Sequence, residues 1–239
     1  MSAIRGARER ARTEVTAAIK EEARRQLADR GAGELSLRAV ARELGMVSSA
    51  LYRYFPSRDD LLTALIIDAY DALGADAEAA LAATEGSDPV SRWTAVCRAV
   101  RAWALGHPHE YALIYGSPVP GYAAPQDTTG PAARVGLALI AVARDAHAAG
   151  TLRETSEEPP AAVLADARSL GERLDVRLPP PVLGKLVAAW AQLFGLVNFE
   201  VFGQFQRVVE AREEFFTRAV ADLARGIGLT APGPGPSRP

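Results

Sequence analysis

Residues 35–62 read LSLRAVARELGMVSSALYRYFPSRDDLL, and this stretch decides the fold class of the N-terminal part of the chain. One apolar helix face is marked out by residues at i, i+3, i+4, i+7 spacing, namely Leu37, Val40, Ala41 and Leu44. Ser36 comes immediately before this helix and is predicted to cap it. Leu35 and Val40 occupy the two positions at which hydrophobic side chains fix the direction of chain entry. We therefore expect a short, well-capped helix over Leu37–Leu44.

A second short helix is predicted directly after the first. Gly45 stands where a helix end favours a residue in the left-handed conformation. Met46 and Val47 then form a tight turn, Ser48 is expected to cap the next helix, and that helix covers Ser49–Tyr54 before Pro56. Two short helices joined by a tight turn form a helix-turn-helix.

The composition of the second helix fits DNA recognition. Small residues at its start leave it slim enough for a major groove about 12 Å wide. Tyrosine hydroxyls and an arginine guanidinium follow at Tyr52, Arg53 and Tyr54, and such donors commonly contact phosphates. Ser57 is predicted to cap the next helix together with Asp60, which holds Arg58 at a defined helix start.

The segments AVARELG and SALYRYFPSRDDLL resemble the DNA-binding region of the tetracycline-repressor (TetR) family of bacterial regulators. The resemblance covers about residues 12–65 without gaps. Members of that family often carry Ser two residues after the glycine, where this chain has Val47, so Ser48 is expected to take over as the cap.

The resemblance implies which residues contact DNA. Tyr52 and Tyr54 match positions that contact phosphates, and Arg38 and Arg58 match further phosphate contacts. The residues that match base-facing positions are Ser48, Ser49, Ala50 and Arg53. The alternative for Tyr52 and Tyr54 is packing between helices, because aromatic side chains at helical spacing usually lie in a core.

Charge is distributed unevenly along the 239 residues. Residues 1–60 carry 12 Lys and Arg against 9 Asp and Glu, a net charge of +3, while the remainder carries 15 against 20. The start of the chain is especially basic, with Arg5, Arg8, Arg10 and Arg12 against Glu9. A basic front end on an acidic body fits a protein that touches phosphate at one end, and the alternative is a solvated helix with scattered arginines.

The rest of the chain is predicted to be helical too. Ala-, Leu-, Arg- and Glu-rich segments alternate with short Gly and Pro punctuation, and no window shows the period-two alternation of a strand. The expected helices outside the motif are Ser2–Asp29, Asp59–Glu85, Pro89–Leu105, His109–Tyr115, Pro131–Ala149, Pro160–Leu170, Pro181–Phe202 and Phe205–Ile227. Residues Gly116–Gly130 and Thr151–Pro159 are expected to be loops, and Ala231–Pro239 a disordered tail. The fold class is therefore all-α.

The helical body contains many aromatic residues that could line a small-molecule cavity. Aromatic walls with a few polar groups are typical of ligand pockets between helices, although most such side chains belong to the core. The predicted ligand-binding set is Trp93, Trp103, His107, Tyr111, Tyr115, Trp190, Phe194 and Asn198. The stretches WTAVCRAVRAWALGHPHEYALIYGSPVPGY and WAQLFGLVNFEVFG also resemble the C-terminal domain of one subgroup of the same family, with Phe194 where that subgroup often has His.

A metal site, a cofactor and an enzymatic function are not expected. His107 and His109 lack a third histidine or cysteine nearby, whereas zinc needs three or four protein ligands. No nucleophile triad or nucleotide-binding loop is present either. Cys97 is the only cysteine, so it is expected to be a buried, inert thiol.

The last two helices are predicted to form a dimer interface. Pro181–Phe202 is apolar nearly all round, and its small residues allow another helix to approach closely. Lys185, Gln192, Asn198 and Glu200 interrupt it, which favours a packed helix over a membrane span. A dimer also suits paired major-groove reading, with half-sites about 34 Å apart or a multiple of it. The alternative is a monomer that buries this helix internally.

Together these features predict a helix-turn-helix domain over residues 1–58, a ligand-binding and dimerisation domain over 59–229, and a tail from 230. We expect a cytoplasmic homodimer that binds a palindromic DNA operator and is released by a small molecule. The alternative is a DNA-binding regulator without a small-molecule switch. No leader peptide is expected, because the N-terminus is polar and arginine-rich.

Overall fold

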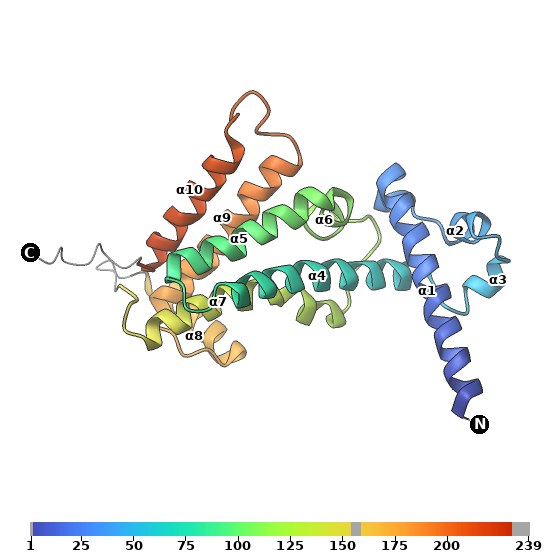
Figure 1. Cartoon of the computed structure of the whole chain (residues 1–239), viewed down its shortest axis with the longest axis horizontal. Coiled ribbons are helices and arrows are strands. Elements are labelled where there is room, and N and C mark those ends of the chain that lie inside the picture. The colour runs from blue at the N-terminus through green and yellow to red at the C-terminus, as the bar shows by residue number, and fades with distance from the viewer. Residues whose placement is uncertain (1, 154–158, 231–239) are drawn as a thin grey trace, which may run out of the picture. The chain divides into compact units, whose positions relative to one another are not determined.

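The computed structural model describes residues 2–153 and 159–230, and helices make up most of this part of the chain (Figure 1). No strand occurs within the described residues, so the all-α prediction is confirmed. The chain divides into two compact units. The first comprises Met1–Asp71 with His107–Ala132, and the second comprises Ala72–Gly106 with Ala133–Pro239.

The first unit contains the helix-turn-helix and a return segment from later in the chain. Its elements are α1 (Ser2–Arg30), the 3-10 turn η1 (Ala32–Glu34), α2 (Leu37–Glu43), α3 (Ser48–Leu51), the start of α4 (Arg58–Ala83), α6 (Pro108–Tyr115) and η2 (Gln126–Thr128). Within this unit α1 contacts η1, α2 and α6. The return of α6 was not expected from the sequence, which placed every residue after 58 in a separate domain.

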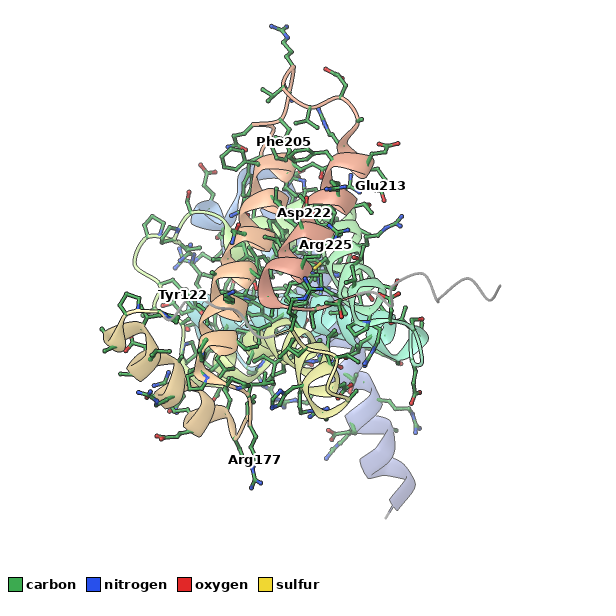
Figure 2. All side chains as sticks on the ribbon, turned by 90° about the vertical axis from the view of Figure 1, so that its left-hand side faces the viewer. Tyr122, Arg177, Phe205, Glu213, Asp222 and Arg225 are labelled. Atoms are coloured by element: carbon green, nitrogen blue, oxygen red, sulfur yellow. The ribbon has the colours of Figure 1, made fainter. Side chains whose placement is uncertain are left out.

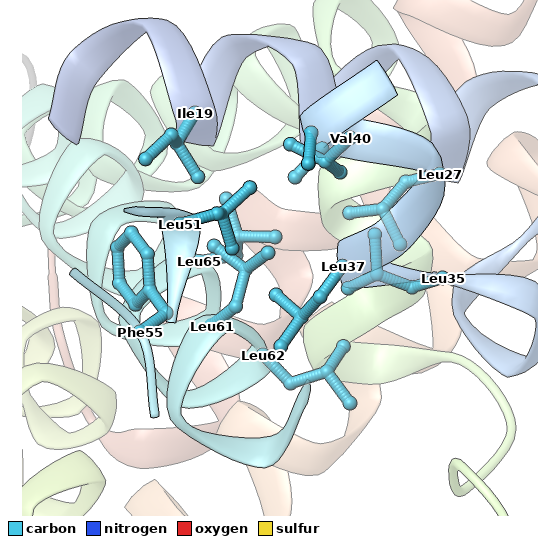
Figure 3. Packing of buried hydrophobic residues seen from close by; sticks show 12 residues of the cluster. Ile19, Leu27, Leu35, Leu37, Val40, Leu51, Phe55, Leu61, Leu62 and Leu65 are labelled. Atoms are coloured by element: carbon cyan, nitrogen blue, oxygen red, sulfur yellow. The ribbon is translucent and has the colours of Figure 1, made fainter. Parts of the chain in front are cut away.

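Buried aliphatic side chains from α1, α2, α3 and α4 share one core in the first unit (Figure 3). Ile19 on α1, Leu51 on α3 and Leu61 on α4 are completely excluded from solvent. Burial of each such side chain contributes about 1.5–3 kcal/mol to folding. The one turn of α3 is thus anchored by Leu51, although four residues are far too few for a helix to be stable alone.

The second unit is a helical body. Its elements are the remainder of α4, α5 (Pro89–Gly106), most of α7 (Thr129–Ala148), α8 (Ala161–Leu174), α9 (Pro180–Val201) and α10 (Arg212–Ile227). Helices α5, α9 and α10 contact one another, and α8 packs along α9. The buried face of α10 follows helical spacing through Phe216, Val220, Ala224 and Ile227. Cys97 lies in this core, and burial raises the pKa of its thiol.

A buried ion pair joins α5 to α9 inside the second unit. Arg101 donates from Nε and Nη2 to the two carboxylate oxygens of Glu200, at 2.7 Å each. The same guanidinium also pairs with Glu213 and lies 5.4 Å from the ring centroid of Phe216. Figure 2 shows Glu213 and Phe205 toward one end of the α9–α10 pair, with Asp222 and Arg225 further along α10. Because Arg101 is nearly buried, these contacts fix three helices to each other.

Helix boundaries differ most from the prediction at the start of α10, the end of α8 and the end of α3, and most other ends differ by one or two residues. Helix α10 begins at Arg212 and not at Phe205, because the chain turns through Gly203 and Arg207, which both have positive φ angles of 80° and 61°. Such angles cannot continue a right-handed helix. Helix α8 continues to Leu174, four residues beyond the expected end, and stops at Asp175 in the left-handed conformation.

Loops and termini agree in part with expectation. Residues 116–125 lie outside any helix, but the expected loop ends earlier than Gly130 because η2 and α7 begin within it. The predicted disordered tail, Ala231–Pro239, and most of the predicted connector Thr151–Pro159 lie outside the described residues.

Candidate functional site

The first helix of the motif forms as its sequence predicts. Ser36 has extended backbone angles, and its Oγ accepts a hydrogen bond from the Ala39 amide at 3.4 Å. Leu35 and Val40 are both buried, which fits their expected roles at the helix start. Gly45 takes the left-handed conformation with a φ of 63°, a geometry that would strain any residue with a Cβ. The cap, the apolar face and the glycine turn are therefore confirmed.

The second helix begins one residue earlier than expected, and its cap is different. Helix α3 covers Ser48–Leu51, with Val47 at the N-cap position and no side chain accepting a hydrogen bond there. The predicted capping role of Ser48 is wrong, because Ser48 is already helical and its carbonyl accepts from the Tyr52 amide. Residues 52–54 form turns after Leu51, with the Arg53 amide donating to the Ala50 carbonyl at 3.3 Å and the Tyr54 amide donating to the Leu51 carbonyl at 2.8 Å.

Half of the eight predicted DNA-binding residues are exposed to solvent. Tyr52 is 42% exposed, and Arg38, Ser49 and Arg53 are also exposed. Ser48, Ala50 and Tyr54 are half-buried. Since Leu51 is the residue of this turn that enters the core, the polar side chains before and after it remain on the surface. Tyr52 is thus not packed between helices, which was the alternative for it.

Tyr54 has a neighbour that sequence reasoning missed. The guanidinium carbon of Arg12 on α1 lies 5.7 Å from the centroid of the Tyr54 ring, within the range of a cation–π contact. Arg12 and Tyr54 are 42 positions apart, so nothing in the local motif links them. The helical spacing of Arg12 and the buried Ile19 was the one signal that could have placed Arg12 on this side of α1.

Arg58 makes contacts that the sequence did not indicate. Its Nε donates to the Leu35 carbonyl at 3.1 Å, and its Nη2 donates to the carbonyls of Ala32 at 2.7 Å and Gly33 at 3.2 Å. The guanidinium therefore fastens the start of α4 to the 3-10 turn before α2. The predicted phosphate contact of Arg58 stays a prediction, and it competes with these three hydrogen bonds.

The predicted cap of α4 is present. The Oγ of Ser57 accepts from the Asp60 amide at 3.1 Å and donates to the Asp60 carboxylate at 2.6 Å. Because helix α4 begins at Arg58, this cap sets the position from which the Arg58 side chain reaches the carbonyls of residues 32–35.

Three residues of the predicted ligand-binding set lie in the first unit. His107 is exposed at the start of α6, whereas Tyr111 is buried. The ring of Tyr115 lies 5.3 Å from that of Tyr111 and 5.9 Å from that of Tyr70 on α4, measured between centroids. Burial raises the pKa of all three tyrosines. Tyr111 and Tyr115 therefore help join α6 to α4.

The other five residues of that set lie in the second unit. Trp93 and Trp103 are buried on α5, and Phe194 is buried on α9. Trp190 is 39% exposed, with its ring 5.7 Å from that of Phe194, and Asn198 is half-buried. The indole Nε1 of Trp93 is buried and has no hydrogen-bond partner within residues 2–153 and 159–230. The eight residues are thus not brought together in one compact unit.

Two cavities of the described residues can each be placed within a single unit, and none of those eight residues lines either of them. One of about 690 Å³ runs along α1 beside Asp68 of α4, in the first unit. The other, of about 320 Å³, lies between the end of α8 and the start of α9, in the second unit. Neither supports the predicted ligand set directly.

The described residues contain no group of three or more His, Cys, Asp and Glu side chains arranged to hold a metal ion. Helix α9 is long and apolar enough to cross a membrane by length and composition, with a mean hydropathy of 1.5. The core helix of a protein that never enters a membrane passes the same test, so this finding is weak evidence.

Comparison with known proteins gives matches over both halves of the chain. Residues 19–65 match the family described as bacterial regulatory proteins, tetR family, and residues 93–223 match a tetracyclin repressor-like C-terminal domain. An HTH-type transcriptional regulator from Mycobacterium tuberculosis is 43% identical over 201 residues, which cover 84% of this chain and 86% of that protein.

Solved structures give the same result. The crystal structure of a regulatory protein that is 38% identical superimposes with a TM-score of 0.72, covering 90% of this chain and 97% of that one. The TetR-family transcriptional regulator PfmR from Thermus thermophilus, at 21% identity and a TM-score of 0.55, shares the fold over 86% of this chain and 95% of its own. The names of these relatives describe regulators and not enzymes.

Proposed function

This chain belongs to the tetR family of bacterial regulatory proteins, and we propose that it is a homodimeric repressor that a small molecule releases from a palindromic operator. DNA binding and transcriptional regulation follow from the family. The repressor role, the operator symmetry, the dimer, the effector and a cytoplasmic location are the proposal.

The exposed surface around α3 carries the DNA-binding part of the proposal. Ser49, Tyr52 and Arg53 are exposed on one short turn that Leu51 holds to the core. Small side chains at the start of this turn allow close approach to base edges, and the hydroxyl and guanidinium groups that follow supply donors to phosphate. Arg38 adds a second exposed cation at the start of α2.

Exposed apolar side chains on the last two helices support a dimer. They are Val187, Trp190, Phe199 and Phe202 from α9 and its end, and Phe215 from α10. Large exposed apolar groups on neighbouring helices are typical of interfaces. Symmetric dimers use the same surface on both copies, which matches a palindromic DNA site.

The effector part of the proposal rests on the second unit and on α4. A buried indole donor at Trp93 is a polar group of the kind that orients a ligand in an aromatic environment. Helix α4 is continuous from Arg58 to Ala83 and contributes residues to both units, so a ligand-dependent shift of its second half would also move its first. Effector binding affects DNA binding if the protein has two conformational states and the effector binds one of them more tightly.

Fluorescence anisotropy on the DNA upstream of the protein's own gene tests DNA binding. We expect the protein to bind this DNA more tightly than a scrambled duplex at the same salt concentration. Contacts to bases add to the affinity that phosphate contacts give to any DNA sequence. Equal affinity for the two duplexes would contradict operator recognition. Mass spectrometry of molecules that co-purify from cell extract, followed by anisotropy with each of them, tests release by an effector.

Light scattering on Phe199→Glu tests the dimer. A charge at this 52% exposed position on α9 should shift the protein from dimer to monomer at micromolar concentration. Val208→Glu is the matched control, since Val208 is 74% exposed in the turn between α9 and α10. A wild-type monomer, or an unchanged Phe199→Glu dimer, would contradict the proposed interface.

A regulator without a small-molecule switch is the second candidate. The observation that favours it is that the predicted ligand residues are divided between the two compact units, three in the first and five in the second. If no co-purified or screened compound raises the melting temperature or releases the DNA, this candidate is preferred.

A further inference from the structure

The first turns of α1 precede the part of the chain that matches the family model. The match begins at residue 19, while α1 begins at Ser2. Residues 7–14 are all exposed, and Figure 1 shows this end of α1 continuing beyond α3 within the first unit. Because residues 7–14 do not pack in the core, packing does not account for the arginines among them.

Two arginines in this segment share a helix face with core residues. An α-helix turns about 100° per residue, so Arg8 and Arg12 project within about 40° of the direction of Ile19. Ile19 is fully buried against α3 and α4. Arg10, in contrast, lies on the opposite side of α1, about 160° from Arg12.

The position of Arg12 shows which way this face is directed. Its guanidinium lies over the ring of Tyr54, which follows α3 and belongs to the predicted DNA-binding set. A guanidinium stacked on an aromatic ring keeps its N–H donors in the plane available to a phosphate. Arg8 lies one helical turn further along the same face.

Arg8, Arg10 and Arg12 differ in their ion pairing from the cations later in the same helix. Lys20 and Arg24 both pair with Asp68, at 2.8 and 2.9 Å, and Arg25 pairs with Glu22. Among the described residues, none forms an ion pair with Arg8, Arg10 or Arg12. Lys20, Arg24 and Arg25 thus hold carboxylates of the fold, whereas Arg8, Arg10 and Arg12 leave their charge to solvent or to a partner.

We propose that Arg8 and Arg12 bind the DNA backbone and extend the contact made by α3. Arg8 lies about 16 Å along the axis of α1 from Ile19, so it reaches phosphates that α2 and α3 do not contact. Guanidinium groups bind phosphate through paired N–H donors, and each contact displaces a bound counterion. The extension therefore adds affinity without base specificity. This inference rests on the proposed DNA-binding function.

Salt-dependent anisotropy on Arg8→Gln, Arg12→Gln and the double variant tests the proposal, with the upstream duplex and a scrambled duplex as probes. At about 100 mM salt, each substitution should weaken binding to both duplexes by roughly three- to tenfold. The slope of log affinity against log salt should fall by about one per arginine. Arg10→Gln is the matched control and should leave affinity and slope unchanged, because its side chain lies on the other face of α1.

Additional variants separate this proposal from its alternatives. Arg8→Lys should keep the wild-type salt slope, because a lysine still supplies one charge to phosphate. Circular dichroism should give wild-type melting temperatures for all variants, since these side chains are exposed. If the wild-type protein binds both duplexes equally, operator recognition fails while a backbone contact can still be measured. If wild type binds the upstream duplex and Arg8→Gln behaves like Arg10→Gln, the proposal is overturned and the proposed function stands.

Discussion

The two compact units differ in how their predicted site residues are arranged. In the first, six of the predicted DNA-binding residues lie on either side of Leu51 between Ser48 and Tyr54, and Leu51 anchors the turn that carries them. The predicted ligand-binding residues come from α5, α6 and α9, and three of the eight lie in the first unit while five lie in the second. A site whose residues are neighbours in the sequence can be predicted from the local sequence pattern. A site whose residues come from distant helices cannot be predicted in this way, because it depends on how those helices pack.

Arginine side chains of the two units also differ in their exposure and pairing. The cations predicted to contact DNA, such as Arg38 and Arg53, are exposed, whereas Arg101 of the second unit is held by two carboxylates. Arg38 and Arg53 thus leave their positive charge available for a partner, whereas the charge of Arg101 is neutralised inside the second unit.

The largest expected effect tests the anchoring of α3. Leu51→Ala should lower the free energy of unfolding by about 2–5 kcal/mol, because the site is fully buried and the cavity cannot collapse completely. Urea denaturation followed by circular dichroism measures it. Leu105→Ala on α5 is the control, since Leu105 is 41% exposed and should change stability by about 0.5 kcal/mol or less. Similar losses for both variants would contradict this assignment.

Glu200→Ala tests the buried pair of the second unit. Removing this carboxylate takes two charge-assisted hydrogen bonds from Arg101, and we expect a loss of about 1.5–3 kcal/mol, with Glu213 still beside the guanidinium. Asp222→Ala removes an exposed carboxylate that pairs with Arg218 and Arg225, and it should destabilise the protein less, because solvent screens these ion pairs. The same denaturation experiment compares them. A smaller loss for Glu200→Ala than for Asp222→Ala would show that the pair does not hold the helices together.

Arg58→Ala and Arg53→Ala distinguish a structural arginine from a DNA-contacting one. Arg58→Ala should destabilise the protein by about 1–2 kcal/mol, because three carbonyl groups lose their donor. Arg53→Ala should retain wild-type stability and weaken DNA binding. Should Arg58→Ala keep wild-type stability and reduce the salt slope by about one, Arg58 is a phosphate contact instead.

Two helix caps give the smallest effect and the clearest pH dependence. Ser36→Ala in the first unit and Asp88→Ala in the second should each cost about 1 kcal/mol, because each cap accepts from amides of the first turn. Burial acts to raise the pKa of Asp88, but hydrogen bonds from Ser91 and Val90 outweigh it and lower that pKa. The contribution of Asp88 is therefore present above the unfolded-state pKa, about 3.9, and is lost as pH falls through the folded-state value.

Thermal melting of both cap variants between pH 7 and pH 3 measures this difference. The deficit of Asp88→Ala relative to wild type should shrink below about pH 4, while that of Ser36→Ala should not change with pH. Parallel curves for the two variants would show that ionisation of Asp88 does not contribute.

The sequence by itself determined the helix-turn-helix. The cap at Ser36, the apolar face of α2, the left-handed Gly45 and the capped start of α4 all follow from interactions within a few residues. The same local reasoning failed at the start of α3, because the N-cap position falls on Val47, whose side chain cannot accept a hydrogen bond, and Ser48 already lies inside the helix.

Only the tertiary structure decided the rest. The hydrogen bonds of Arg58 to residues 32–35, the ring contact of Arg12 with Tyr54 and the return of α6 to the first unit join positions more than 20 residues apart. The pairing of Arg101 with Glu200 spans 99 positions. Local propensity carries no information about such contacts, because they depend on which helix faces meet after the chain has packed. The sequence therefore determined which elements form and which residues they expose, and packing decided which charges hold the fold and which remain for DNA.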